Sequence, residues 1–130
     1  MIVLDACVLI AHFDENDTHH GRAGRLLAGL GVEPAIMSPL SRAEVLVAPA
    51  RAGRRRAVED AMDRIGIAID DLPAAAAGQL AELRAHTGLK VPDCCVLLTA
   101  ERHGPAEIAT FGARLARVAA ERGLVVRTGT

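Results

Sequence analysis

Brief, continuous apolar runs alternate with longer amphipathic segments along the whole chain. The brief runs predict strands that are buried on both faces, and a recurrence of apolar residues every three or four positions predicts helices. Strand and helix in alternation indicate a parallel sheet covered on both faces, a three-layer α/β/α domain with about five strands. The predicted strands are 2–4, 35–37, 67–69, 107–110 and 124–126, and the predicted helices are 6–13, 19–30, 39–47, 51–65, 73–86, 93–102 and 113–122.

Composition is consistent with one domain, residues 1–130, whose core is aliphatic. Half of the residues are hydrophobic (51%) and only 2% are aromatic, so leucine, valine, isoleucine and alanine must fill the interior. The formal net charge is −1, which excludes general electrostatic attraction to a polyanion. A nucleic acid would therefore have to be held by a local basic patch or by a metal ion.

The three cysteines, Cys7, Cys94 and Cys95, lie in apolar runs and two of them are adjacent. This odd number predicts buried free thiols in a reducing compartment rather than a disulfide framework. No leader-like segment precedes the first predicted strand, and no apolar stretch approaches the roughly 20 residues that span a bilayer. We therefore expect a cytoplasmic protein without membrane contacts.

Three acidic residues carry the candidate chemistry. Asp5 follows the first apolar run, Glu44 follows the second, and Asp93 follows Pro92 at the start of a predicted helix. Parallel sheets gather such positions at the carboxyl ends of their strands, and clustered carboxylates need a hard divalent cation to offset their repulsion. Each acid also has a structural interpretation: Asp5 and Asp93 can cap helices, and Ser41-x-x-Glu44 matches a capping box. The two interpretations are compatible, because a helix N-terminus keeps a carboxylate ionised.

The three acids and Thr110 lie in four separate segments of the chain. In order, the segments are Ile2-Val3-Leu4-Asp5-Ala6-Cys7-Val8-Leu9-Ile10, Ser41-Arg42-Ala43-Glu44-Val45, Val91-Pro92-Asp93-Cys94-Cys95 and Ile108-Ala109-Thr110-Phe111-Gly112. These segments resemble the ordered motifs of PIN-domain ribonucleases, in particular the VapC-type toxins of VapBC toxin–antitoxin pairs. The resemblance covers essentially the whole chain.

The resemblance implies a ribonuclease that hydrolyses RNA phosphodiester bonds with one or two Mg²⁺ or Mn²⁺ ions. Asp5, Glu44 and Asp93 would bind the metal, Glu44 directly or through water, and Thr110 would hydrogen-bond a ligand or a metal-bound water. A bound water of lowered pKa would attack in line and leave 5′-phosphate and 3′-hydroxyl ends. The implied partners are the RNA substrate, a VapB-like antitoxin whose peptide lies across the acidic groove, and a second copy of the chain.

The chain departs from the family pattern at two positions. Gly112 stands where the fourth motif usually supplies another aspartate, and Ala6 stands where threonine or serine is common. Three carboxylates can hold one divalent ion but hold a second poorly, so we expect one tight metal site and reduced activity. The alternative is a non-cleaving PIN-like module that binds RNA or an antitoxin.

Several basic and histidine residues give weaker signals. Arg114 and Arg117 follow the fourth motif and are candidates for RNA phosphate contacts. The adjacent pair His19-His20 predicts a solvent-facing first helical turn rather than a metal site. A second basic cluster could contact RNA, contact a partner or form a solvated helix face; it comprises Arg51, Arg54, Arg55 and Arg56.

Other enzyme classes lack their signatures. Cys7 occupies the position where a phosphoaspartyl phosphatase needs a second aspartate, and Lys90 precedes the third motif, unlike the lysine of a receiver domain. No Walker sequence is present, and Gly29-Leu30-Gly31 lacks the third glycine of a dinucleotide fingerprint. Which RNA is cut, and at which bond, stays open.

Overall fold

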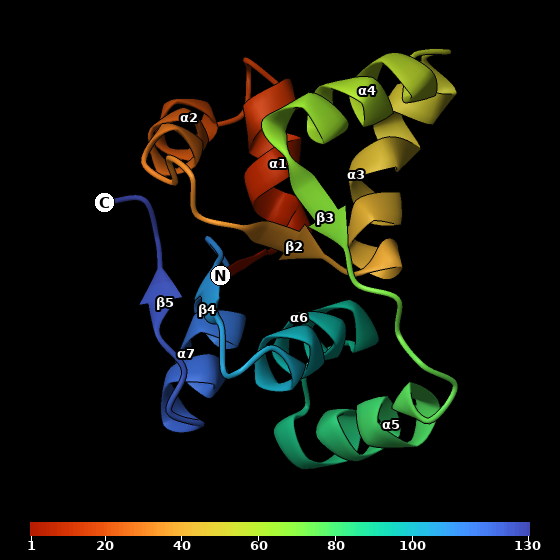
Figure 1. The fold of residues 1–130 in the computed structure, drawn as a ribbon, viewed down its shortest axis with the longest axis vertical. Coiled ribbons are helices and arrows are strands. Elements are labelled where there is room, and N and C mark those ends of the chain that lie inside the picture. Colours follow the sequence, from red (N-terminus) through yellow and green to blue (C-terminus); the bar gives the residue numbers. More distant parts are fainter.

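The computed structural model describes all residues, Met1–Thr130, and confirms the three-layer α/β/α architecture (Figure 1). Five strands form one parallel sheet in the order β3-β2-β1-β4-β5. The strands are β1 (Ile2–Leu4), β2 (Ala35–Met37), β3 (Ile67–Ile69), β4 (Glu107–Ala109) and β5 (Val126–Arg127). The helices are α1 (Ala6–Phe13), α2 (His20–Ala28), α3 (Pro39–Arg51), α4 (Arg55–Ile65), α5 (Ala76–Thr87), α6 (Val91–Arg102) and α7 (Ala113–Glu121). None of these helices has the length and apolarity that crossing a bilayer requires.

The central strand β1 pairs with β2 on one side and with β4 on the other. Leu4 lies opposite Ala109 in the register of β1 and β4. The next residues, Asp5 and Thr110, therefore leave the sheet side by side at its carboxyl edge. The backbone N–H of Asp5 extends this ladder by donating to the Ala109 carbonyl oxygen at 3.0 Å.

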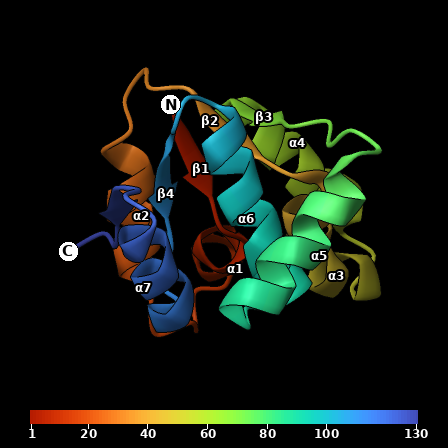
Figure 2. The same ribbon diagram turned by 90° about the horizontal axis from the view of Figure 1, so that it is seen from below.

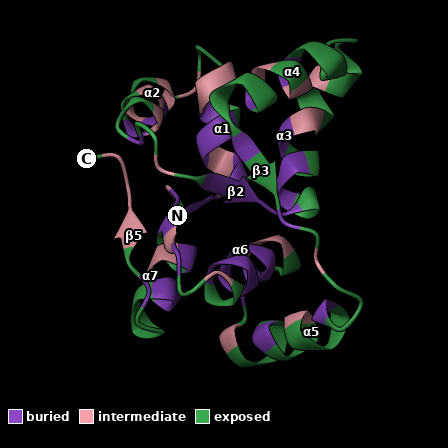
Figure 3. Ribbon diagram, viewed as in Figure 1, coloured by how far each residue is buried: buried purple, intermediate pink, exposed green.

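Each face of the sheet is sealed by its own hydrophobic core. Side chains from α1, α2, α3 and α4 pack on one face with Ile2 and Leu4, whereas α5, α6 and α7 pack on the other with Val3 and Ile108. Figures 1 and 2 show these helix groups on opposite sides of the sheet. Burial is concentrated along the sheet and the inner faces of the helices, most completely in α6 (Figure 3). The expected aliphatic interior is thus present as two layers.

Helix α3 extends further than the sequence predicts. It was expected to end at Val47, before Pro49, but it continues through Pro49 to Arg51. Pro49 lies close to the C-terminal end, where its missing N–H costs one hydrogen bond without breaking the remaining turn. The next helix consequently begins at Arg55 rather than Arg51, after a turn in which Gly53 has a φ of 72°.

The N-termini of two helices also differ from expectation. Helix α6 begins at Val91 and not at Asp93, because Pro92 in the first turn has no N–H that needs an intrahelical acceptor. Helix α3 is capped by Ser38, whose hydroxyl oxygen accepts from the Ser41 N–H at 3.1 Å. The capping box predicted at Ser41 and Glu44 is therefore wrong, and the Glu44 carboxylate is not engaged in capping.

Candidate functional site at the carboxyl edge of the sheet

Asp5 is held by side chains from both ends of the sequence. Its Oδ2 accepts hydrogen bonds from the Thr110 hydroxyl at 2.7 Å and from the Cys7 thiol at 3.2 Å. Asp5 is the N-cap residue of α1, yet it makes no side-chain cap hydrogen bond. The carboxylate is therefore oriented by Thr110 and Cys7, and the capping interpretation of Asp5 is wrong.

Thr110 is fully buried and both of its hydrogen-bonding roles are used. The hydroxyl donates to Asp5 and its oxygen accepts from the Gly112 N–H at 3.0 Å. Sequence reasoning expected this hydroxyl to contact a ligand or a metal-bound water. In the structure the hydroxyl donates to Asp5 and so joins the fourth motif to the first, while the expected contact with a ligand or a metal-bound water stays a prediction.

Cys7 is a component of this network that sequence reasoning missed. Its sulfur donates to Asp5 and accepts from the Phe111 N–H at 3.4 Å. Burial, and then the negative charge of Asp5, raise the pKa of the Cys7 thiol to about 12. The thiol therefore keeps its proton at neutral pH and serves as a donor, not as a nucleophile. Its position two residues after Asp5, in the first turn of α1, was the signal available in the sequence.

Glu44 and Asp93 lie within electrostatic reach of Asp5. Desolvation, followed by the charges of Asp5 and Asp93, raises the pKa of the Glu44 carboxyl above its ordinary value. Desolvation and the charge of Asp5 likewise raise the pKa of Asp93. Three acids from three separate segments thus repel one another at one edge of the molecule, as expected if parallel strands gather them there.

The donor chemistry of these acids is that of a hard divalent cation. Carboxylate oxygens are the ligands that Mg²⁺ and Mn²⁺ prefer, and a bound cation would relieve the repulsion that raises the two pKa values. As the side chains stand, no three His, Cys, Asp or Glu residues gather closely enough to form a compact ligand set. The residue types therefore fit a divalent ion, although the side chains do not form a closed ligand set around one position.

Two cations modify the electrostatics beside Asp93. The positive charges of Arg114 and Lys90 both lower the pKa of Asp93, against the larger effects that raise it. Arg117, the second arginine predicted to contact substrate, lies near Glu121 on the same helix, with 4.0 Å between Arg117 Nε and Glu121 Oε1. Of the two arginines on α7, only Arg114 lowers the pKa of one of the three candidate acids, Asp93.

Gly112 occupies the N-cap position of α7 and supplies no side-chain cap. Its φ of −77° is accessible to any residue. A Cβ atom at this position would meet the Thr110 hydroxyl oxygen at 3.4 Å, an ordinary contact. The backbone can therefore carry the aspartate that the family pattern has here, beside Thr110 and Asp5.

The remaining candidates from the sequence have structural explanations or lie elsewhere. His19 and His20 are half-buried rather than solvent-facing: His19 lies against the Phe111 ring, and His20 Nδ1 is 2.8 Å from the Ala11 carbonyl oxygen. Cys94 and Cys95 are buried free thiols, as predicted.

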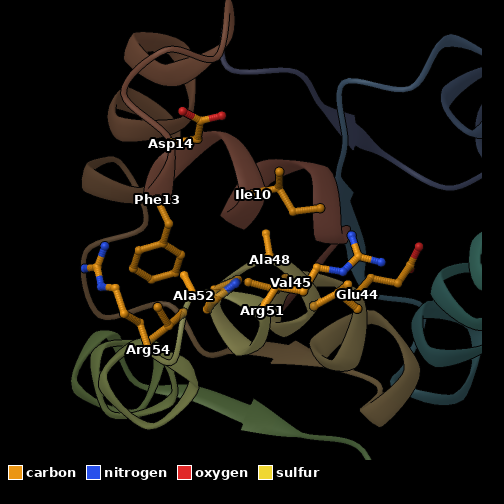
Figure 4. A pocket seen from close by; sticks show the side chains of 12 residues that line it. Ile10, Phe13, Asp14, Glu44, Val45, Ala48, Arg51, Ala52 and Arg54 are labelled. Carbon is orange, nitrogen blue, oxygen red and sulfur yellow. The ribbon is translucent and has the colours of Figure 1, made fainter.

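An apolar pocket of about 470 Å³ opens beside Glu44 between α1, α3 and α4. In Figure 4 the Phe13 ring and Arg54 lie at one end of this pocket and Glu44 lies at the other. Two members of the basic cluster, Arg51 and Arg54, line it. The lining residues are Ile10, Phe13, Asp14, Glu44, Val45, Val47, Ala48, Pro49, Arg51, Ala52, Arg54 and Val58.

The fold and its acid-lined edge define a parallel α/β domain of a kind found in nucleases. The sequence profile of the PIN domain family matches residues 2–121, and the chain belongs to this family. None of the curated proteins is similar to the chain at the level of sequence.

Solved structures with the same fold include a toxin–antitoxin complex and a toxin. A toxin–antitoxin complex from Klebsiella pneumoniae superposes with a TM-score of 0.78 at 23% identity, covering 100% of this chain and 98% of that one. VapC20 of Mycobacterium tuberculosis, a toxin that cleaves the sarcin–ricin loop, has a TM-score of 0.74 at 19% identity, covering 91% and 95%. FitAcB of Neisseria gonorrhoeae has a TM-score of 0.70 at 20% identity, covering 99% and 98%. At these identities the similarity shows the fold.

Proposed function

We propose that the protein is a metal-dependent endoribonuclease, the toxin of a type II toxin–antitoxin system. The observation that carries the proposal is the electrostatic coupling of Asp5, Glu44 and Asp93, which come from three distant segments of a PIN domain. Such coupling is costly without a cation, and catalytic sites are where pKa values are shifted in this way. The toxin role is further supported by the toxins and toxin–antitoxin complexes that share the fold.

In the proposed mechanism Asp5 and Asp93 would hold an Mg²⁺ or Mn²⁺ ion directly, and Glu44 would hold it directly or through water. The ion, when bound, supplies a water of lowered pKa and neutralises charge on the phosphoryl oxygens. Thr110 and Cys7 occupy Oδ2 of Asp5, so they fix its orientation and leave Oδ1 without a side-chain donor. No protein nucleophile is needed, because water attacks in line with the departing ribose oxygen.

The acidic replacements that test this mechanism are Asp5→Asn and Asp93→Asn. Each removes one negative charge and one metal ligand with little change in shape. We expect either variant to slow Mn²⁺-dependent cleavage of cellular RNA by roughly two orders of magnitude or more. Asp60→Asn, at an exposed acid on helix α4, is the matched control and should cleave at the wild-type rate.

The same cleavage assay distinguishes a metal-dependent ribonuclease from a PIN-like module that binds RNA or an antitoxin without cleaving RNA. Cleavage that depends on added Mn²⁺ and is abolished by both replacements supports the nuclease. RNA binding that is the same with and without metal, with no cleavage in any condition, would contradict it and support a non-cleaving module. Gly112 makes this outcome worth testing, since it leaves the site one carboxylate short of the family pattern.

We further infer that the partner protein is an antitoxin that occupies the apolar pocket beside Glu44. An amphipathic segment could bury apolar side chains against Ile10, Phe13 and Val47. Acidic side chains of the same segment would meet Arg51 and Arg54, which pair with no carboxylate within the chain. This segment would reach the acidic edge at Glu44. We also propose that the protein is located in the cytoplasm and that two copies of the chain form a homodimer.

A further inference from the structure

Three cationic side chains surround the loop that joins α5 to α6, directly before Asp93. Arg84 comes from α5, Lys90 from the loop itself and Arg114 from α7. All three residues are exposed. They belong to segments on both sides of Asp93 in the sequence, so the tertiary structure creates the cluster.

None of these three cations forms an ion pair within the chain. The next two arginines along the chain from Arg114 are paired: Arg117 lies near Glu121, and Arg122 donates to Glu101 at 2.7 Å. The positive charge beside the α5–α6 loop is therefore left without a carboxylate partner.

The loop that presents the cluster is held by several hydrogen bonds. Arg84 Nη1 donates to the carbonyl oxygens of Gly88 at 3.2 Å and Leu89 at 2.9 Å. Arg114 Nη2 donates to the same Gly88 oxygen at 3.3 Å. Gly88 has a φ of 72°, a conformation that other residues rarely adopt, and Leu89 is buried. Lys90 therefore extends from a loop of defined backbone conformation, and the hydrogen bond to Gly88 holds the Arg114 guanidinium beside the same loop.

The position of these cations works against the binding of a metal ion. Lys90 is the N-cap residue of α6, whose first turn contains Asp93, and Arg114 reaches the same loop by donating to the Gly88 carbonyl oxygen at 3.3 Å. Both positive charges therefore lie beside Asp93 and would also repel a divalent cation held there. A guanidinium has five N–H donors and Arg114 uses one of them on Gly88. Positive charge beside an acidic site, with donors to spare, suits an anionic ligand that lies next to the metal.

We propose that Lys90 and Arg114 bind a phosphate of the RNA backbone next to the phosphate that is cleaved. Arg84 holds the loop in place and does not contact the RNA. The assignment rests on the proposed function for the identity of the ligand as RNA. It also separates the two arginines of α7: Arg114 contacts substrate, whereas Arg117 does not.

The test measures RNA binding separately from metal binding. Fluorescence anisotropy with a labelled RNA hairpin in EDTA reports binding without cleavage for wild type, Lys90→Gln, Arg114→Gln and the double variant. We expect each single replacement to weaken binding about fivefold at physiological salt and to lower the slope of log Kd against log salt by about 1. Arg117→Gln, on the same helix, is the matched control and should bind as wild type.

Mn²⁺ affinity, measured by the loss of the free-ion EPR signal, distinguishes a substrate contact from a structural role. Removing a positive charge near Asp93 should leave Mn²⁺ affinity unchanged or increase it, while RNA affinity falls. Loss of RNA and Mn²⁺ affinity together, with a lower Tm, would overturn the proposal and show that the side chains only maintain the loop.

Failure of this inference is separable from failure of the proposed function. If the double variant binds RNA with the wild-type Kd and salt slope, or if Arg117→Gln weakens binding equally, the phosphate site is wrong although wild-type cleavage still supports the nuclease. If wild type cleaves no RNA but the two replacements weaken binding as expected, the phosphate site stands and the nuclease proposal fails.

Discussion

At the scale of single residues, the orientation of Asp5 depends on two neutral donors. Thr110 is separated from Asp5 by 105 positions and Cys7 by only two, yet both donate to the same oxygen. Thr110 and Cys7 are themselves 3.7 Å apart. A carboxylate that is held in this way loses less conformational freedom when it binds a ligand, so its affinity for a cation depends on its neighbours.

Replacing Cys7 tests this dependence. Cys7→Ala removes the thiol donor, whereas Cys7→Ser keeps a donor of smaller size at the same position. Because one hydrogen bond contributes about 0.5–1.5 kcal/mol, we expect Cys7→Ala to weaken Mn²⁺ binding roughly two- to tenfold and Cys7→Ser to restore most of the loss. Calorimetric titration with Mn²⁺ gives the affinities. Equal affinities in all three proteins would show that Thr110 alone orients Asp5.

The raised pKa of Asp93 leads to a prediction about stability. A carboxyl group with a higher pKa in the folded state than in the unfolded state stabilises the fold below its unfolded pKa. That contribution is lost as pH rises through the folded pKa. In the absence of metal, Asp93→Asn should therefore raise the Tm at pH 7 relative to wild type, and the difference should vanish near about pH 4.

The Tm of wild type and the Tm of Asp93→Asn should also differ in their response to metal. Mn²⁺ at pH 7 should raise the Tm of wild type and leave Asp93→Asn nearly unchanged, because the cation relieves repulsion only where the carboxylate is present. Scanning calorimetry across pH, with and without Mn²⁺, measures both effects. A metal-free Asp93→Asn protein that is less stable than wild type at pH 7 would contradict the assigned cause of the pKa shift.

At the scale of single elements, the N-terminus of α7 is the part of the site that differs most from the family pattern. Gly112 places backbone at the correct position and leaves the first turn of α7 without a side-chain cap. The helix itself is conventional: Leu115, Val118 and Ala119 face the core. Helix α7 is therefore intact, and only the carboxylate that the family pattern has at position 112 is missing from the acidic edge of the sheet.

Restoring an acid at this position should strengthen metal binding. Gly112→Asp adds a fourth carboxylate beside Thr110, and the backbone and the open contact accept the side chain without strain. We expect tighter Mn²⁺ binding and faster RNA cleavage. Gly112→Ser is the matched control, because serine caps a helix about as well as aspartate but carries no charge. An unchanged metal affinity in Gly112→Asp would show that the fourth motif lies elsewhere.

Most elements were predictable from local pattern, and the errors were also local. The strands at 2–4, 35–37 and 67–69 agree with the structure because a short apolar run between turn residues has few alternatives. Only the first two are buried throughout, since Ala68 and Ile69 of the edge strand β3 are exposed. The errors concern the ends of elements: Pro49 was read as a stop, Pro92 was placed in the loop before α6, and the last strand, predicted at 124–126, is formed by Val126 and Arg127. Proline ends a helix only where the missing hydrogen bond and the steric clash cannot be accommodated, and this depends on the neighbouring turns.

At the scale of the whole molecule, the order of the strands decides which residues meet. The central position of β1 puts Asp5 between β2, which leads to Glu44, and β4, which leads to Thr110. The pocket beside Glu44 likewise exists only because α1, α3 and α4 pack on the same face. The proposed nuclease site and the proposed antitoxin site are thus neighbours that share Glu44.

A replacement in the pocket should separate partner binding from catalysis. Ala48→Arg places a large cation in the apolar space at an exposed position of α3. We expect it to prevent co-purification with the small protein encoded by an adjacent open reading frame and to leave RNA cleavage unchanged. Ala57→Arg, exposed on α4 outside the pocket lining, is the control and should co-purify. Retained binding by Ala48→Arg would place the antitoxin elsewhere.

The amino-acid sequence by itself determined the α/β class, the aliphatic core, nearly all of the elements and the identity of the candidate acids. These depend on periodicity, turn residues and short motifs, which act over a few neighbouring positions. Only the tertiary structure decided that Thr110 and Cys7 orient Asp5, that Lys90 and Arg114 stand beside Asp93, and that an apolar pocket adjoins Glu44. Cys7 and Lys90 are near their acids in the sequence, but the Thr110–Asp5 contact, the approach of Arg114 and the pocket join distant segments. Their proximity comes from the strand order and from packing on both faces of the sheet, which no local sequence pattern encodes.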